Sequence, residues 1–258
     1  MGNLSIGWDL LFAAALGAVA LWYFTDSRAL PLWRQISFGA GLTLSAVVLV
    51  GPVAHAAIHT FSIHMVQHIS LMMLISPLLS LGAPLAVGME SRYPRVRSLS
   101  HSFISSRLAR VIFNPHVGFV IFLFVLIATH FSPLANAGMR NPNIHCLELI
   151  LFLTGGLIFY YPVMKGNPTP IFVPYSTRTL SLFAMMLPET MVGFFLYSGN
   201  RLLHDLPHGM SMSHGLSDQH TGGAIMWAMG MLIDTVWIVL AARDWFENER
   251  ELAEAEDE

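Results

Sequence analysis

The side chains of this chain that are best suited to chemistry are its twelve histidines. In the segment HMVQH, His64 and His68 stand four residues apart, which places both imidazoles on one face of a helix. Met72 extends the same face by one more turn. Neutral imidazole binds copper, zinc, iron and nickel, whereas the thioether of methionine favours Cu(I). This mixed set therefore predicts a metal site and favours copper.

Two more histidines stand where separate segments can converge. His130 and His145 flank a short polar stretch, so folding can bring both near His64 and His68. Glu148 follows His145 on the same helix face, inside an apolar segment where an unpaired carboxylate is costly. It could bind the metal, fix the tautomer of an imidazole, or bond to a neighbouring helix. The competing interpretation of the paired imidazoles is two interfacial histidines that bind water or backbone carbonyls.

A second group of metal-binding side chains lies in the segment LLHDLPHGMSMSHGLSDQH. The members that could capture a metal ion are His204, His208, Met210, Met212 and His214, and His220 ends the segment. Such a segment could capture Cu(I) and pass it inward. Its Gly, Ser and Pro content fits a flexible loop with incidental ligands equally well.

The composition indicates which elements must position these side chains. The chain is 54% hydrophobic and 11% charged, whereas soluble domains carry about 25% charged residues. Its apolar residues form blocks close to the roughly 20 residues that span a bilayer as a helix. The blocks are 6–24, 36–53, 63–87, 116–131, 145–163, 180–197 and 221–241. We therefore expect an all-α polytopic membrane protein, with a bundle of seven transmembrane helices in residues 1–246.

The two ends of the chain differ in charge. No Lys or Arg precedes the first apolar block, so we expect a retained helix rather than a cleaved signal peptide. Residues 247–258 form an acidic tail, which we expect to be a solvated helix end or a disordered extension on the cytoplasmic side. The single cysteine, Cys146, cannot form an intramolecular disulfide and is expected to be a small buried apolar residue.

Basic residues predict the orientation in the membrane, because cytoplasmic loops are enriched in Lys and Arg. Of the 13 Lys and Arg residues, all except Arg140 and Arg201 follow the first, third, fifth and seventh blocks. The N-terminus is therefore expected outside and the C-terminus in the cytoplasm, with the protein in the cell inner membrane. In this orientation every histidine except His101 and His116 lies at the outer side.

Two further acids stand inside apolar blocks. Glu189 follows Pro188 in the sixth block, and Asp234 lies in the seventh. Ionised groups at such positions need partners or water. Both a proton-linked role and a structural role stay open for them.

The chain resembles the polytopic CtaG family of cytochrome c oxidase assembly factors from about residue 45 to residue 242. The matching segments are HMVQH followed by PLLSLGAP, then HFSPL, the helix that opens at His145 with Glu148, and DQHTGGAIMW. The resemblance implies a seven-span protein that supports maturation of a haem-copper oxidase of the respiratory chain, with copper insertion as its role. It implies a functional set of His64, His68, His130, His145, Glu148 and Asp218.

The chain departs from the family pattern at Leu149, where relatives often carry a histidine directly after the acid. His220 could supply the missing ligand. The partners that the resemblance implies are an oxidase subunit and a copper donor protein, besides the lipid bilayer. We expect no nucleic-acid partner.

Three functions compete on these grounds. The first is a non-catalytic assembly factor that holds Cu(I) at the outer face and transfers it to an oxidase subunit by ligand exchange. The second is a zinc-dependent intramembrane hydrolase, since three protein ligands and a water form a common catalytic zinc site. The third is an electron-transfer membrane protein with haem held between two histidines.

Overall fold

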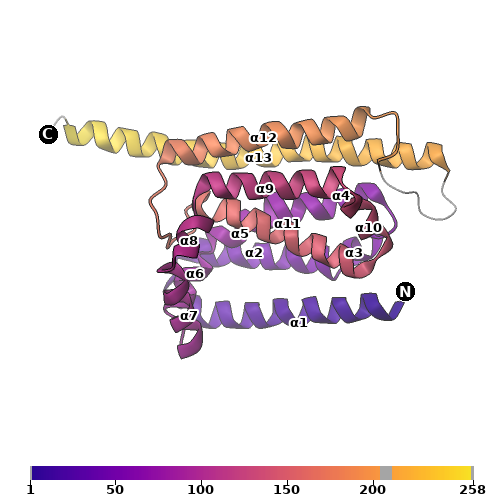
Figure 1. The fold of residues 1–258 in the computed structure, drawn as a ribbon. Helices are drawn as coiled ribbons and strands as arrows, with labels where there is room; N and C mark the ends of the chain where they lie inside the picture. The colour runs from indigo at the N-terminus through magenta and orange to yellow at the C-terminus, as the bar shows by residue number, and fades with distance from the viewer. Residues whose placement is uncertain (1, 204–210, 257–258) are drawn as a thin grey trace.

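The computed structural model describes the backbone of residues 2–203 and 211–256, and within these ranges it is all-helical. The elements are α1 (Gly2–Asp26), η1 (Ser27–Ala29), α2 (Leu32–Leu49), α3 (Pro52–Ala57), α4 (Phe61–Ile69), η2 (Ser70–Ile75), α5 (Ser76–Leu81), α6 (Pro84–Met89), α7 (Pro94–Ile104), α8 (Arg107–Ile112), α9 (Pro115–Phe131), α10 (Pro133–Arg140), α11 (Pro142–Val163), α12 (Tyr175–Ser198) and α13 (Met212–Glu256). The long helices lie side by side as an elongated bundle (Figure 1).

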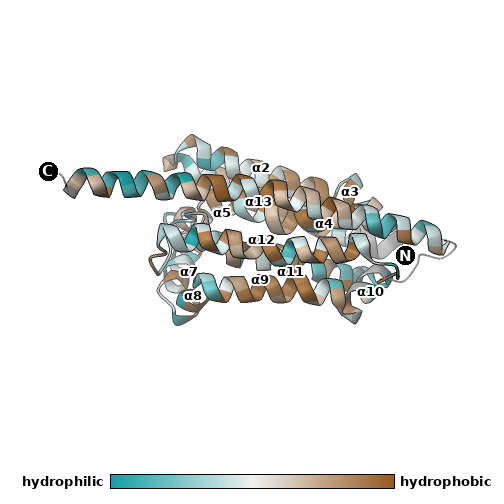
Figure 2. Ribbon diagram, turned by 90° about the horizontal axis from the view of Figure 1, so that it is seen from above, coloured by the Kyte–Doolittle hydropathy of each residue, from teal (hydrophilic) through white to brown (hydrophobic). Residues whose placement is uncertain are grey.

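Six helical segments in the described residues are long and apolar enough to cross a membrane. They are Gly7–Ala29, Leu32–Leu49, Phe61–Leu81, Pro142–Val163, Tyr175–Ser198 and Met212–Ala255. The remaining apolar block forms α9, which has 17 residues. The expectation of an all-helical polytopic protein is thus confirmed for six spans, and the seventh stays a prediction. Figure 2 shows apolar residues along the middle of the bundle and hydrophilic residues toward the C-terminus.

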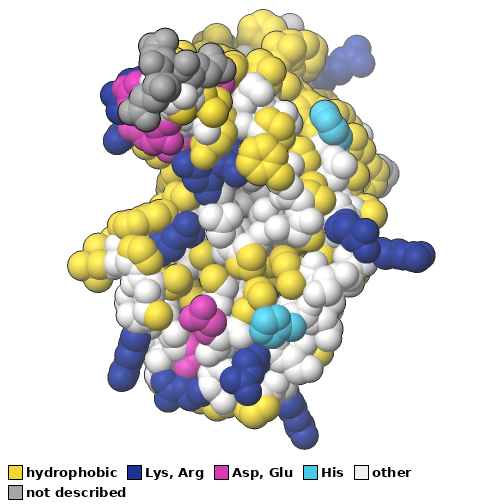
Figure 3. Space-filling view, turned by 90° about the vertical axis from the view of Figure 1, so that its left-hand side faces the viewer, with side chains coloured by type: hydrophobic (Ala, Val, Ile, Leu, Met, Phe, Trp, Pro, Cys, Tyr) yellow, Lys and Arg dark blue, Asp and Glu magenta, His cyan; other side chains and the backbone are white. Residues whose placement is uncertain are grey.

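The two ends of the bundle carry different side chains. We call the end where α6, α7 and α8 lie the arginine end, and the opposite end, where α3 and α10 lie, the histidine end (Figure 1). Lys and Arg side chains surround the arginine end (Figure 3). Among them, Arg34 donates to the carbonyl of Leu81 at 2.9 Å, and Lys165 pairs with Asp244 at 2.7 Å. The sequence predicts basic residues on one side of the membrane and histidines on the other, and these two groups lie toward opposite ends of the bundle.

The third apolar block is not one regular helix. Between α4 and α5 the segment η2 is π-helical, and its Leu71 carbonyl accepts a bond from the Ser76 hydroxyl at 2.7 Å. Helix α11 packs closely against this turn, because a Cβ on Gly156 would lie 2.6 Å from the carbonyl oxygen of Met72. The span ends at Leu81 rather than at residue 87, since Ala83 has a φ of 49° and Pro84 starts α6.

Helices α12 and α13 form the most extensive helix pair, and small residues bring their backbones together. A Cβ on Gly193 would lie 2.8 Å from the backbone nitrogen of Trp227. Helix α13 begins at Met212, so the placement of residues 212–220 in a loop before the last span is wrong. The acidic tail continues the same helix through Glu256, with an ion pair between Arg243 and Glu247 at 2.7 Å.

Candidate metal centre

Three helices bring five polar side chains together at the histidine end. Helix α4 carries His64 and His68, α9 carries His130 near its end, and α11 carries His145 and Glu148 near its start. All five residues are buried, with at most 8% of their surface exposed. We call these five residues the histidine cluster. The expected convergence of the ends of these helices therefore occurs, and the role of the side chains as metal ligands stays a prediction.

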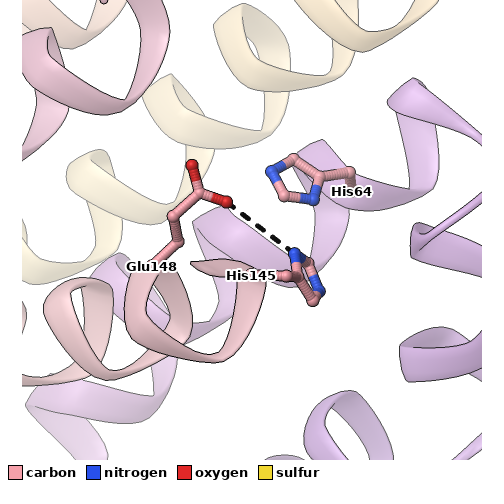
Figure 4. A group of neighbouring side chains, drawn as sticks. All are labelled: His64, His145 and Glu148. Carbon is pink, nitrogen blue, oxygen red and sulfur yellow. Dashed lines mark ion pairs between the residues drawn. The ribbon is translucent and has the colours of Figure 1, made fainter. Parts of the chain in front are cut away.

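His64, His145 and Glu148 form the tightest group. Each offers one ligand atom, and these atoms all lie within 4.8 Å of one another. Nδ1 of His145 is 3.8 Å from Oε2 of Glu148, and the ring of His64 lies beside both (Figure 4). Ligand atoms on one tetrahedral ion lie roughly 3.3 Å apart, so side-chain shifts of about 1 Å would close this group around a metal.

The imidazoles of His68 and His130 extend the cluster beyond this group. The ring centroids of His68 and His130 are 4.6 Å apart, and those of His64 and His145 are 5.1 Å apart. With a metal–nitrogen bond of about 2 Å, two imidazoles on one ion have centroids roughly 5–6 Å apart. His68 joins the two pairs, since its ring lies 6.2 Å from that of His64. The four imidazoles therefore form one continuous row with spacings close to those of shared ligation.

Hydrogen bonding leaves imidazole nitrogens of this row available. Nδ1 of His130 is 2.7 Å from the carbonyl oxygen of Leu126, which can only accept, so Nδ1 donates and Nε2 keeps its lone pair. Nε2 of His68, His130 and His145 is buried, and each lacks a hydrogen-bond partner among the described residues. A buried polar atom left unpaired costs about 1–3 kcal/mol. Three such atoms in one cluster favour a bound ligand over histidines that are satisfied by backbone carbonyls.

A glycine on α10 makes room for the carboxylate of the cluster. A Cβ on Gly138 would overlap the carboxylate of Glu148. Helix α10 can therefore cover Glu148 and keep it 2% exposed only because position 138 has no side chain. Sequence reasoning missed this contact, because α10 lies in a short polar connection.

Asp218 has a different place from the other members of the functional set that the resemblance implies. Its Oδ2 accepts from the backbone nitrogen of Phe61 at 2.7 Å, and its Oδ1 accepts from that of Ser62 at 3.2 Å. The first N–H groups of a helix lack partners within the helix, and its N-terminus favours negative charge. Asp218 on α13 thus caps α4, the helix that carries His64 and His68.

The two residues after Asp218 bind the chain that follows α12. Oε1 of Gln219 accepts from the backbone nitrogen of Leu203 at 2.8 Å, and its Nε2 donates to the carbonyl of Arg201 at 3.1 Å. Nε2 of His220 lies 2.8 Å from the carbonyl oxygen of Gly199. The segment DQH therefore joins α13 to α4 and to the preceding loop. His220 lies outside the group of His64, His145 and Glu148, so its role as a ligand stays a prediction.

The segment before α13 is described only in part. His204, His208 and Met210 lie outside the described residues. Met212 and His214 are exposed in the first turn of α13. The metal-capture role of this segment stays a prediction.

Comparisons with known proteins identify the same family that the sequence segments resemble. A family model described as cytochrome c oxidase caa3 assembly factor matches residues 12–248. The chain belongs to this family. It is 28% identical over 270 residues to uncharacterised proteins of Mycobacterium bovis and Mycobacterium tuberculosis. These alignments cover 96% of this chain and 40% of each relative, so the chain spans less than half the length of these relatives.

A third relative matches a shorter part of the chain. An uncharacterised protein of Mycobacterium leprae is 28% identical over 211 residues, which cover 76% of this chain and 32% of that protein. No solved structure matches the chain.

Met72 of this CtaG-family chain lies in the π-helical segment. The expectation that it continues the face of His64 and His68 assumed regular α-helical spacing, and the wider π turn after Ile69 changes that register. Met72 is buried in the main apolar core with residues such as Phe122. Its role as a thioether ligand stays a prediction.

The chain contains a second buried polar group, formed by α11, α12 and α13. Asp234 lies near both Glu189 and Tyr160, and these three residues are at most 3% exposed. Both carboxylate oxygens of Glu189 and the hydroxyl of Tyr160 lack a hydrogen-bond partner among the described residues. We call this trio the acid cluster. Sequence reasoning singled out its two acids but missed Tyr160, because a tyrosine within an apolar span is typical of ordinary core packing.

Proposed function

We propose that this chain binds copper as Cu(I) in the histidine cluster and supports copper insertion into a haem-copper oxidase. The observation that carries the proposal is the burial of four imidazoles and one carboxylate together, where Nε2 of His68 and Nε2 of His130 have no hydrogen-bond partner among the described residues. Membership of a family of cytochrome c oxidase assembly factors supplies the client. The partners are then an oxidase subunit and a copper donor protein.

The charge of the cluster favours a monovalent ion. Glu148 supplies one negative charge beside His145, and buried imidazoles are neutral ligands. Bound Cu(I) cancels that charge, whereas Zn²⁺ leaves one positive charge in a site of low dielectric, where an uncompensated charge is costly. The row of imidazoles lets the ion exchange one nitrogen ligand for the next without a change of oxidation state.

Placement in the membrane follows from the two ends of the bundle. Helices α7 and α8 contribute four arginines, Arg95, Arg97, Arg107 and Arg110, to the arginine end. Since basic residues concentrate on the cytoplasmic side, the histidine end faces outward and the C-terminus lies inside. With α9 as its seventh span, the protein sits in the cell inner membrane and holds copper at its outer face.

A zinc-dependent intramembrane hydrolase is the second candidate, and one observation favours it. Two histidines and one glutamate, His64, His145 and Glu148, are a ligand set of catalytic zinc sites that leave a position for water. Haem fits less well, because haem between two imidazoles separates their centroids by roughly 6 Å with the macrocycle between them. The centroid distances of 4.6 Å for His68 and His130 and 5.1 Å for His64 and His145 are too short for that plane. The 6.2 Å pair of His64 and His68 lies on one face of one helix, so these rings cannot bind opposite sides of a haem.

The test is metal analysis of the protein purified in detergent and loaded with Cu(I) under reducing conditions. We expect the wild-type chain to retain near-stoichiometric copper and the variant His64→Ala/His68→Ala to lose it. The matched control is His101→Ala/His116→Ala, which removes two exposed histidines from the arginine end and should retain copper. Stoichiometric zinc, a haem spectrum, or copper retention by the first variant would each contradict the proposal.

A further inference from the structure

A small pocket opens beside the histidine cluster, between α1, α3, α4 and α11. Its polar lining comes from Asp9, His55, Gln67, His145 and Cys146. Its volume is about 40 Å³. A cavity needs roughly 10–15 Å³ to hold a water molecule, so the pocket has room for a small hydrated group or an ion. One cluster residue, His145, therefore faces a space outside the cluster.

The inner part of the pocket has buried polar atoms without partners. Gln67 is fully buried, and its Nε2 donates to the carbonyl of Val48 at 2.6 Å. Its Oε1 and the Nε2 of His145 have no hydrogen-bond partner among the described residues. The thiol of Cys146 lines the same space and is 6% exposed. An oxygen, a nitrogen and a sulfur are thus available to a ligand within the pocket.

The outer part of the pocket carries a pair of polar side chains that solvent can reach. Nε2 of His55 on α3 lies 3.7 Å from Oδ2 of Asp9 on α1, and these side chains are 61% and 24% exposed. A bond from Nε1 of Trp8 to Oδ1 of Asn143 at 2.9 Å ties α1 to the start of α11 and fixes this side of the pocket. A carboxylate and an imidazole therefore stand between solvent and the inner ligands.

We propose that this pocket is the access route by which a metal ion reaches the histidine cluster. Asp9 and His55 take the ion from solvent, and Gln67, Cys146 and His145 take it inward. His145 belongs to both sites: its Nδ1 faces Glu148, while its other ring nitrogen points away from that carboxylate (Figure 4). Each step exchanges one coordinate bond for another, and no electron is transferred. This inference rests on the proposed function, since it assumes that the cluster binds a metal.

The experiment separates the rate of metal loading from the final amount bound. Cu(I) is supplied from a coloured chelator complex to the detergent-purified chain, and the loss of colour is followed in time. Charged groups at the mouth of a site raise association rates by about tenfold or more. We expect Asp9→Asn/His55→Ala to load roughly tenfold more slowly and still reach the wild-type copper content. The matched control His101→Ala, which removes an exposed histidine from the arginine end, should load at the wild-type rate. The variant His214→Ala tests the segment before α13 as the rival route.

The outcomes distinguish this inference from the function it rests on. A double variant that loads at the wild-type rate overturns the access route and leaves copper binding intact. Slow loading of His214→Ala with normal loading of the double variant assigns the route to the segment before α13 and also overturns it. A wild-type chain that binds no copper at equilibrium contradicts the proposed function, and it then contradicts the access route as well.

A second variant tests the route without removing any ligand. Ala54 lines the pocket, so Ala54→Leu narrows it while Asp9 and His55 remain. Cys146 is the only thiol of the chain, and its labelling by a small methanethiosulfonate reports whether the pocket is open. We expect Ala54→Leu to slow both labelling and copper loading, with Cys146→Ser as the control for specific labelling. Slower labelling with unchanged loading means that the ion enters elsewhere and overturns the proposal.

Discussion

The bundle buries two polar clusters of opposite character. The histidine cluster combines four imidazoles with the single carboxylate of Glu148, whereas the acid cluster combines the carboxyls of Glu189 and Asp234 with the phenol of Tyr160. An imidazole can be buried neutral and still offer a lone pair, so several can share one dry site. Two neighbouring carboxylates cannot both stay ionised in such a site without a proton or a cation.

The carboxyl groups of the two clusters also have different neighbours. Glu148 faces Nδ1 of His145 at 3.8 Å, whereas Glu189 interacts with another acid, Asp234. Asp234 in turn interacts with Glu189 and Tyr160, neither of which can carry a positive charge. The carboxylate of the histidine cluster is therefore placed to offset the charge of a metal ion. The acid cluster is expected to carry a proton instead, and the following predictions test this contrast.

The largest expected effect follows removal of the negative charge from the histidine cluster. Glu148→Gln keeps the size of the side chain but removes the charge that offsets Cu(I). We expect Cu(I) affinity to fall by about 10- to 100-fold, the range for losing a group that supports metal ligands. Competition with a chromogenic Cu(I) chelator measures the change. Glu189→Gln is the matched control, and an equal loss of affinity in that variant would remove the distinction between the clusters.

The next effect comes from the covering helix of the same cluster. Gly138→Ala places a methyl group where the Glu148 carboxylate lies, so the carboxylate must turn away from His145. We expect Cu(I) affinity to fall by about tenfold, because a displaced supporting group costs metal affinity. The same chelator competition applies. Gly17→Ala is the control, since a Cβ there meets no heavy atom within 4 Å. Equal affinities of the two variants would mean that the position of Glu148 does not matter.

A smaller effect is expected from the cap of α4. Asp218→Ala leaves the backbone nitrogens of Phe61 and Ser62 without their acceptor, which costs about 1–2 kcal/mol of stability. Asp218→Asn keeps one acceptor oxygen and should lose about half as much. Thermal unfolding in detergent measures both variants. Because the cap holds the helix of His64 and His68, Cu(I) should protect Asp218→Ala less than the wild-type chain. Unchanged unfolding temperatures would show that α4 does not need this cap.

The sequence predicted those features that follow from spacing and composition. The apolar blocks are helical, because length and hydropathy are local properties, although the third block is divided by the π turn and its span ends at Leu81. His64, His130 and His145 converge, because alternate connections of a bundle lie at the same end. The contact between Asp218 and Phe61 joins residues 157 positions apart and depends on how α13 packs against α4, so no local pattern could reveal it.

Other features of the site lie beyond sequence reasoning for related reasons. Gly138 matters only because α10 folds over Glu148, and the π turn after Ile69 has no residue pattern that marks it. Helix α13 begins earlier than expected because packing against α12 and the contacts of Gln219 hold residues whose composition is typical of a loop. Each of these three features depends on tertiary packing.

The smallest effect is expected in the acid cluster, and it sharpens the contrast most directly. The hydroxyl of Tyr160 is buried without a hydrogen-bond partner among the described residues, so Tyr160→Phe removes an unsatisfied group. Leaving such a group unpaired costs about 1–3 kcal/mol, and deleting it should leave stability unchanged or raise it by up to about 1 kcal/mol. Thermal unfolding in detergent measures the change, with Tyr23→Phe as the control, since the Tyr23 hydroxyl donates to the carbonyl of Gly82 at 2.7 Å. A marked loss of stability in Tyr160→Phe would show that the phenol holds a ligand together with Glu189 and Asp234, and the acid cluster would then resemble the histidine cluster in needing one.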